Sequence, residues 1–162
     1  MGVLGDSSVP AFQDKLQEQL QLRANLANTS VVIGPPSPGV AQEKIWIALL
    51  EVKGDEDWAA LGRLQKEERY TQSVYISVIT RDGESDSKRG RDTAYAIRKE
   101  IADQLLADPT VGATVWQAQV SKRQEFLPRL GIEVPDAQGH MTVDYSWREA
   151  ALFVDIVVKN RM

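Results

Sequence analysis

The sequence predicts an α+β domain in which a mainly antiparallel sheet has two helices packed on one face. Two segments have apolar residues at helical spacing, and five segments have the alternating or continuous apolar pattern of strands. These segments follow one another as helix, strand, strand, strand, helix, strand, strand. With 162 residues and 43% hydrophobic content, the chain is long enough for one core, so residues 1–162 are expected to form a single domain.

The first part of the chain predicts a helix and two strands. After a flexible start over 1–8, a helix is expected over 9–27, with Ser8 as its cap and an apolar stripe that includes Phe12, Leu16 and Leu20. A short strand at Val31–Ile33 then meets the proline-rich turn "GPPSPG". The next strand, "KIWIALLEVKG", is apolar on both sides at its centre.

The second part predicts a long strand, a helix and a final pair of strands, interrupted by two long loops. The strands are "RYTQSVYISVITRD", "GATVWQAQVSKR" and the last apolar segment, which "HMTVDYSW" joins as one bent strand or as two. The helix is "SKRGRDTAYAIRKEIADQLLADP". The segments 54–66 and 123–139 are expected to be long loops, and long loops on a rigid scaffold commonly carry contacts.

The final strand, "REAALFVDIVVKNR", has two different sides. One side is purely apolar, whereas the other places Asp155 between Phe153 and Val157. A sheet with helices on one face leaves this second side to be covered in another way. Either the two long loops fold back over it, or neighbouring copies of the chain cover it.

Catalytic, cofactor and metal sites are not expected. The chain has no cysteine, which excludes disulfides, thiolate metal sites and cysteine nucleophiles. Its single histidine, His140, lies in an alternating segment that places it roughly 13 Å from Asp144. The carboxylates Asp55, Glu56 and Asp57 cluster in a predicted loop, where such groups are usually solvated.

Nucleic acid and membranes are not expected as specific partners. Prolines remove the backbone donors that a phosphate loop at "GPPSPG" would need, and "SDSKRGR" is the single basic run. A formal net charge of −4 opposes a broad phosphate-binding face. No apolar run reaches 18 residues and the start lacks the pattern of a secretion signal, so we expect a soluble protein made in the cytosol.

Several segments together resemble a known family. The helix "PAFQDKLQEQL", the strand and turn "VVIGPPSPG" and the strand "KIWIALLEV" are followed by "ISVITRDG", "AYAIRKEIADQLLAD" and "REAALFVDIVVKNR". In this order they resemble the tail terminator (tail-completion) proteins of long-tailed bacteriophages, over about residues 10–161. The segments 54–66 and 123–139 depart from the compact members of that family in being longer.

The resemblance implies a structural virion protein that is not an enzyme. Such subunits form a ring, expected to be a homohexamer, on the last ring of tail tube protein. The ring ends tube polymerisation and gives head-completion and neck proteins a docking surface. The protein would be assembled in the bacterial cytoplasm and would reside in the virion at the neck, and its acidic balance suits a lumen through which DNA passes without specific binding.

The resemblance also implies two groups of contact residues. The subunit interface is expected on the second side of the sheet, with Asp155 and Lys159 as a possible charge pair between subunits: Trp46, Leu50, Phe153, Asp155, Val157 and Lys159. Contacts to tube or neck proteins are expected in the two long loops: Asp55, Asp57, Trp58, Arg63, Phe126, Arg129 and Leu130.

Two alternative functions stay open at this point. Another neck component, such as a head-closure or head–tail joining protein, uses a similarly small fold at the same junction. A small monomeric enzyme or nucleic-acid-binding accessory domain belongs to a different class. The tail terminator and the neck component both predict rings, whereas the enzyme or accessory domain predicts a monomer.

Overall fold

The computed structural model describes residues 7–36, 43–58, 66–81 and 84–161. Its elements follow the predicted order of helix, strand, strand, strand, helix, strand, strand, with one additional 3₁₀ turn. The helices are α1 (Val9–Gln21), the 3₁₀ turn η1 (Ala24–Leu26) and α2 (Glu84–Ala107). The strands are β1 (Ser30–Ile33), β2 (Lys44–Trp58), β3 (Lys66–Arg81), β4 (Gln117–Pro135) and β5 (Met141–Arg161).

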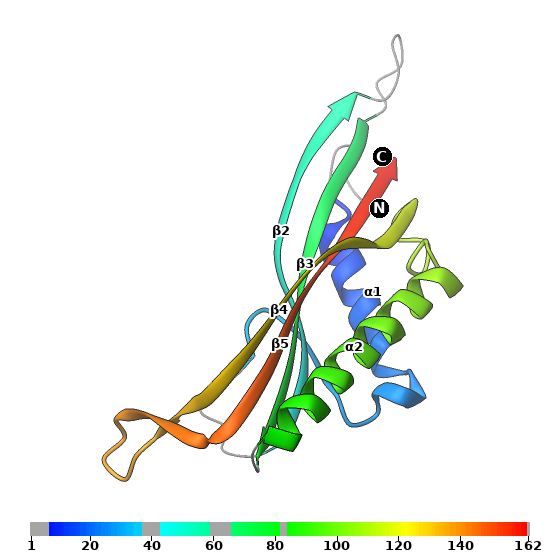
Figure 1. Ribbon diagram of the computed structural model, residues 1–162. Coiled ribbons are helices and arrows are strands. Elements are labelled where there is room, and N and C mark those ends of the chain that lie inside the picture. The colour runs from blue at the N-terminus through cyan, green and yellow to red at the C-terminus, as the bar shows by residue number, and fades with distance from the viewer. Residues whose placement is uncertain (1–6, 37–42, 59–65, 82–83, 162) are drawn as a thin grey trace.

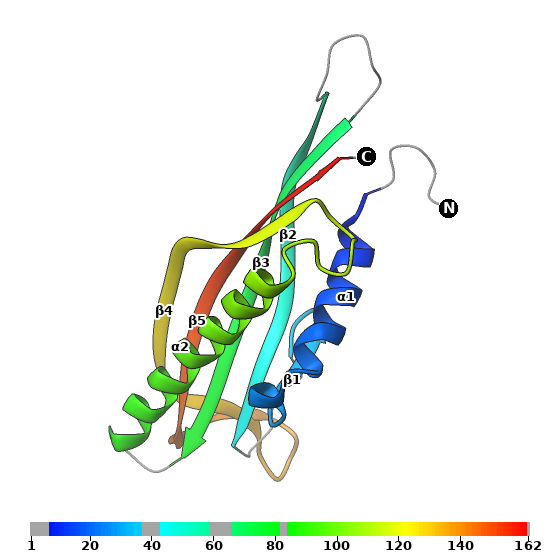
Figure 2. The ribbon, with the colours of Figure 1, turned by 90° about the vertical axis from the view of Figure 1, so that its right-hand side faces the viewer.

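The five strands form one sheet in the order β1-β2-β3-β5-β4. Only the β1–β2 pair is parallel, and the other three pairs are antiparallel. Both helices lie on the same face of this sheet (Figure 2). The α+β fold class is therefore confirmed. The last segment is one continuous strand, β5, which decides between the two possibilities that its sequence allowed.

The core lies between the helices and the facing side of the sheet. Ile47, Ile76 and Leu152 are register partners on β2, β3 and β5, and all three are fully buried. They belong to one apolar cluster with residues of α1 and α2. Burial of each such side chain stabilises the fold by about 1.5–3 kcal/mol. This face is therefore the one that holds the domain together.

The first helix is shorter than predicted and begins differently. It ends at Gln21, because Arg23 is extended and donates hydrogen bonds to Glu100 and Gln104 of α2. Ser8 makes no side-chain cap, since its hydroxyl donates to Glu68 of β3 at 2.6 Å instead. The prediction of a flexible start is therefore wrong for residues 7 and 8, while residues 1–6 lie outside the described residues.

Both predicted long loops are strand over residues that the structure describes, 54–58 and 123–135, so both predictions are wrong for those residues, while 59–65 lie outside the described residues. β2 and β3 stay paired as far as Trp58 and Lys66, so only 59–65 separate them. The segment 123–139 continues β4 to Pro135 and pairs with β5. Its proline at 128 is tolerated because β4 is an edge strand, where an N–H can be missing without breaking a ladder.

Two of the strand pairs, β2–β3 and β4–β5, extend from opposite ends of the molecule (Figure 1). The β2–β3 pair extends beyond the helices at the upper end. The end of β4 and the start of β5 form the β4–β5 arm, residues 131–146, which projects at the lower left of the same view. Gly131, at its base, has a φ of +83°, a left-handed conformation that glycine adopts without strain.

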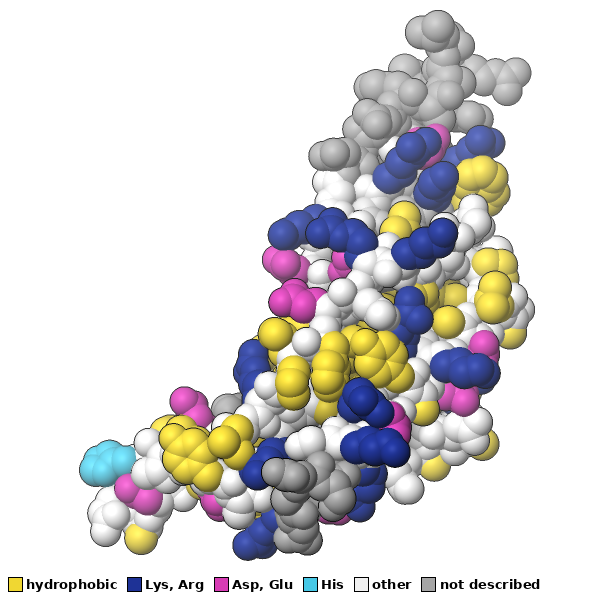
Figure 3. Space-filling view, in the orientation of Figure 1, with side chains coloured by type: hydrophobic (Ala, Val, Ile, Leu, Met, Phe, Trp, Pro, Cys, Tyr) yellow, Lys and Arg dark blue, Asp and Glu magenta, His cyan; other side chains and the backbone are white. Residues whose placement is uncertain are grey.

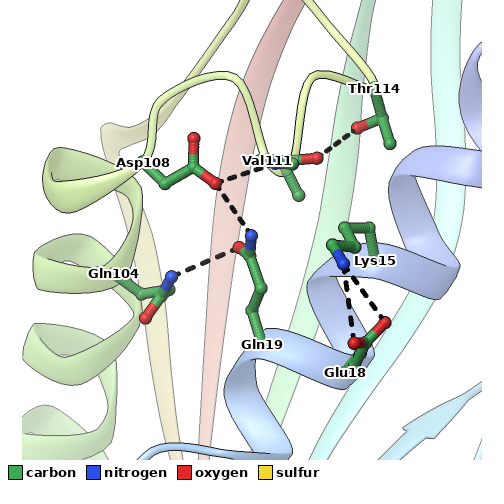
Figure 4. A network of polar contacts seen from close by, with 8 residues as sticks. Lys15, Glu18, Gln19, Gln104, Asp108, Val111 and Thr114 are labelled. Carbon is green, nitrogen blue, oxygen red and sulfur yellow. Dashed lines mark hydrogen bonds and ion pairs between the residues drawn. The ribbon is translucent and has the colours of Figure 1, made fainter.

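A polar network joins the ends of the two helices (Figure 4). The Asp108 carboxylate accepts hydrogen bonds from the Gln19 amide and from the backbone N–H of Gly112, each at 2.8 Å. Gln104 donates to Gln19 at 3.2 Å. The hydrogen bonds from Gly112, Thr110 and Gln19 lower the pKa of Asp108. The turn after α2 is therefore fixed against α1.

Candidate interaction surfaces

The face of the sheet opposite the helices carries aromatic and polar side chains in successive rows. Strand register places Ala48, Tyr75 and Phe153 side by side on β2, β3 and β5. The neighbouring row contains Trp46 and Ser77. These residues alternate with the buried residues of the core, so they point away from the helices. We call this surface the helix-free face.

The centre of the helix-free face is a carboxylate beside an aromatic stack. The Tyr75 and Phe153 rings stack with centroids 5.1 Å apart. One oxygen of Glu149 accepts hydrogen bonds from the Tyr75 hydroxyl at 2.7 Å and the Ser77 hydroxyl at 2.6 Å, and its other oxygen lies 3.7 Å from Arg129. Burial, then the hydrogen bond and charge of Glu149, raise the pKa of Tyr75 to about 12.

Near neutral pH, this cluster combines fixed polar groups with an aromatic surface. The hydroxyls of Tyr75 and Ser77 are neutral donors there, and Glu149 is already satisfied by them. The rings of Tyr75 and Phe153 offer a flat apolar surface that is half-buried within one chain. Large aromatic surface with a few fixed polar groups is characteristic of protein interfaces.

The predicted interface residues lie on two strands, β2 and β5, and one of these residues has little free surface. Trp46 is only 9% exposed, and the Lys44 ammonium lies 4.7 Å from its ring centroid. The expectation that Trp46 lacks cover within a monomer is therefore wrong. Leu50 lies where the β2–β3 register shifts, which interrupts the alternation on which its predicted orientation depends. Phe153 and Val157 are half-buried on β5.

The expected charge pair lies on β5, on the same face. Asp155 and Lys159 are both half-buried, and the Ser73 hydroxyl lies 3.5 Å from the Asp155 carboxylate. Together with Arg69, Lys159 contributes to the positive surroundings that lower the pKa of Glu67. A pairing of Asp155 or Lys159 with a neighbouring subunit stays a prediction.

The predicted tube and neck contacts are divided between the two strand pairs. Asp55, Asp57 and Trp58 lie in β2, not in a loop, and their side chains are outside what the structure describes, as is the whole of Arg63. The other three lie in β4. Phe126 is half-buried beside Tyr95, with ring centroids 5.9 Å apart, whereas Arg129 and Leu130 are exposed: Phe126, Arg129 and Leu130.

The β4–β5 arm has an apolar surface that the sequence reading missed. Met141, Val143 and Tyr145 alternate along β5, so they share one side of the arm, and they are 50%, 44% and 64% exposed. The alternation of apolar and polar residues in "MTVDY" is the sequence signal that could have predicted this surface. Figure 3 shows apolar side chains on the arm, with the histidine, His140, near its tip. His140 is exposed, and its Nδ1 lies 4.0 Å from the Asp136 carboxylate.

The residues that the structure describes include no group of three or more metal-binding side chains, and none of their helices could cross a membrane. No protein-family model matches the chain, and no curated protein matches it. Inferences about function therefore depend on the geometry of the helix-free face and of the two projecting strand pairs.

Proposed function

We propose that this protein is a structural subunit that assembles into a ring and caps the tail tube of a long-tailed bacteriophage. In this role it stops tube polymerisation and offers a docking surface to the proteins of the head and neck. The observation that carries the proposal is the helix-free face, where half-buried side chains such as Phe153 and Val157 lie on the side of the sheet opposite the main apolar cluster.

The helix-free face supports self-association because, among the residues that the structure describes, neither helix covers it. Both helices contact the opposite face, and neither predicted loop folds back over this one, since each continues a strand over the residues described. Rings formed by repeated contact between copies bury such surface on every subunit. The residues proposed for this contact remain Phe153, Val157, Asp155 and Lys159. Trp46 would contribute only the small part of its ring that is exposed.

The two projecting strand pairs support contacts with two different partners. A ring that connects a tube to a neck needs one binding surface above it and one below. The β2–β3 pair and the β4–β5 arm extend from opposite ends of the sheet (Figure 1). This arrangement suits one subunit that touches tube protein at one end and neck protein at the other.

The test of this function is a capping assay with purified tail tube protein. We expect rings of roughly six chains by light scattering or negative-stain electron microscopy, and tubes that stop growing when the protein is added. Phe153→Asp and Val157→Asp should give soluble protein that neither forms rings nor caps tubes. Leu22→Asp, a change at an exposed position of the helix side, is the matched control and should leave both activities intact.

Different results would contradict the proposal. A protein that stays monomeric at high concentration and leaves tube growth unchanged is not a tail terminator. Rings that bind a head-completion protein but do not stop tube growth would indicate a neck component instead. Circular dichroism of each variant separates loss of assembly from loss of folding.

A further inference from the structure

The β4–β5 arm changes direction where it leaves the rest of the sheet (Figure 2). The strand register gives the reason for this bend. Between the paired positions on its two sides, β4 has one residue and β5 has three: Gly131 against 145–147. Extra residues in one strand of an antiparallel pair bend that strand and disrupt its ladder locally. The bend is therefore built into the pairing of β4 with β5.

The charged side chains on either side of the extra residues hold them in place. The Asp144 carboxylate accepts hydrogen bonds from the Ser146 hydroxyl at 2.6 Å and from the Ser146 N–H at 3.0 Å. The Arg148 guanidinium donates to the carbonyl oxygens of Tyr145 at 2.8 Å and Trp147 at 3.2 Å. Backbone groups that leave a ladder need other partners, and here neighbouring side chains supply them. These contacts favour a single conformation of the bulged segment.

Trp147 connects the bend to the body of the sheet. Its side chain is only 4% exposed, and the guanidinium carbon of Arg81 lies 5.3 Å from its ring centroid. Arg81 is the last residue of β3 and the register partner of Trp147. Hydrogen bonds from Ser146, then the Trp147 side chain and the charge of Arg81, lower the pKa of Asp144. The carboxylate that holds the bulge therefore lies close to the anchor on β3.

The β4 side of the bend has space only for glycine. Gly131 adopts a left-handed conformation, with a φ of +83°. A Cβ at this position would lie 2.7 Å from Val143 Cγ1 and 3.3 Å from the Asp144 carbonyl oxygen. Because no side chain keeps the backbones apart, β4 packs directly against the β5 segment that precedes the bulge. This close approach fixes the base of the arm from its second strand.

We propose that Gly131 and 144–148 form an elbow that sets the direction of the β4–β5 arm relative to the sheet, with Asp144 as its positioning residue. An isolated two-stranded ribbon is only marginally stable in water, so an arm without such contacts would sample many directions. The elbow opposes this motion from both strands, through the hydrogen bonds of Asp144 and Arg148 on β5 and the close approach of Gly131 on β4.

A fixed direction of the arm matters for binding. The exposed apolar side chains of the arm, Met141, Val143 and Tyr145, are then presented in one orientation before any partner arrives. Less conformational entropy is lost when a partner binds a preorganised surface than when it binds a mobile one. The inference deepens the proposed function, and it rests on that function for the expectation that the arm contacts tube or neck protein.

A pair of spin labels measures the direction of the arm, and the chain has no cysteine that would compete for their attachment. We would label Gln138→Cys in the turn of the arm and Gln21→Cys at the end of α1, both at exposed positions. Dilution with unlabelled full chain ensures that only distances within one molecule are detected. Double electron–electron resonance should give one narrow distance distribution. A broad distribution at this stage would overturn the inference.

Removal of the positioning carboxylate should loosen the arm. Asp144→Ala leaves the Ser146 N–H and hydroxyl without their acceptor, so the narrow distribution should be lost and replaced by a broad one. The matched control is Glu133→Ala, which removes an exposed carboxylate from the same arm and should leave the distribution narrow. An unchanged distribution for Asp144→Ala, or equal broadening in both variants, contradicts the role given to Asp144.

A conservative variant and hydrogen exchange separate this role from a general effect on stability. Asp144→Asn keeps a side-chain oxygen that can accept from Ser146, so it should retain the narrow distribution that Asp144→Ala loses. Faster hydrogen exchange in Asp144→Ala should be confined to the arm and its elbow, 131–148. Equal broadening by both substitutions, or faster exchange that extends to the buried strand residues Ile47 and Leu152, would overturn the inference.

The capping assay distinguishes failure of the elbow from failure of the proposed function. Asp144→Ala should still form rings, because Asp144 lies in the arm, but it should bind tube or neck protein more weakly at that end. A narrow distribution from a protein that does not cap tubes would keep the elbow and reject the tail-terminator role. Tube capping by a protein whose arm gives a broad distribution would keep that role and reject the elbow.

Discussion

The two faces of the sheet each hold a carboxylate largely shielded from solvent, and the two carboxylates have different kinds of partner. Glu68, on the helix side, accepts hydrogen bonds from the Ser8 N–H at 2.9 Å and from the Ser7 hydroxyl, both about sixty residues away in sequence. Glu149, on the helix-free face, accepts from Tyr75 and Ser77, which lie on the adjacent strand.

The difference shows how the two faces are used. Glu68 joins separate elements, because it holds the start of α1 against β3 and satisfies an N–H that the helix leaves unpaired. Glu149 stays within one layer and fixes the rings and hydroxyls of the helix-free face without bringing another element onto it. One face is packed against the two helices, whereas the polar contacts of the other stay within a single layer.

The largest expected contrast comes from adjacent residues that point to opposite faces. Leu152→Ala should lower the free energy of unfolding by about 3 kcal/mol, because Leu152 is fully buried against the helices and its truncation leaves a cavity. Phe153→Ala, one residue along, should cost much less, because Phe153 is half-exposed and stacks on Tyr75 at the surface of the helix-free face. Urea unfolding of both variants measures the difference, and equal losses would contradict the division of the faces.

Removal of the helix-side carboxylate should have the next largest effect. Glu68→Ala leaves the Ser8 N–H and hydroxyl without their buried acceptor, at a cost of about 2 kcal/mol in the free energy of unfolding. Faster hydrogen exchange should be confined to the first turns of α1. Glu125→Ala, at an exposed position of β4, is the matched control and should be nearly neutral. A cost for Glu68→Ala as small as that of the control would mean that α1 is held by its apolar stripe alone.

Alkaline pH should destabilise the fold, because it ionises Tyr70 on the helix side and Tyr75 on the helix-free face. Burial is the main cause that raises the pKa of Tyr70 and of Tyr75 to about 12 each, so the folded state favours the neutral phenol. This stability is complete below the ordinary tyrosine pKa of about 10 and is lost as pH rises from there through 12. For the buried Tyr70, the loss amounts to about 2 kcal/mol by pH 12. Tyr70→Phe should flatten the pH dependence of unfolding between these values.

The smallest expected effect sharpens the comparison on the helix-free face. Glu149→Gln removes a negative charge that contributes to the raised pKa of Tyr75, so this pKa should fall toward its ordinary value. Absorbance titration of the phenolate measures the shift. The helix-side Tyr70 is the internal control, since its pKa depends on burial, Ser8 and Glu68 instead. An unchanged Tyr75 titration would mean that burial alone sets its pKa.

The periodicity of the sequence was sufficient to predict the fold class and the order of elements. Residues such as Phe12, Leu16 and Leu20 recur at helical spacing, and the alternation of β5 separates Leu152 from Phe153, because one sheet face is apolar and the other mixed. The candidate surface was predicted in part. Phe153 and Val157 lie on the helix-free face, whereas Trp46 proved to be nearly buried beside Lys44.

Other features depended on contacts between residues far apart in the chain. The segments 54–66 and 123–139 contain the glycine, proline and charged residues typical of loops, yet strand pairing overrode these local preferences over 54–58 and 123–135. The Glu68–Ser8 and Glu149–Tyr75 hydrogen bonds join positions that no local pattern relates. The sequence by itself determined which residues can be buried and with what period, because that depends on local spacing. Tertiary structure alone decided which polar groups meet and which apolar surfaces stay uncovered, because both depend on how distant segments pack.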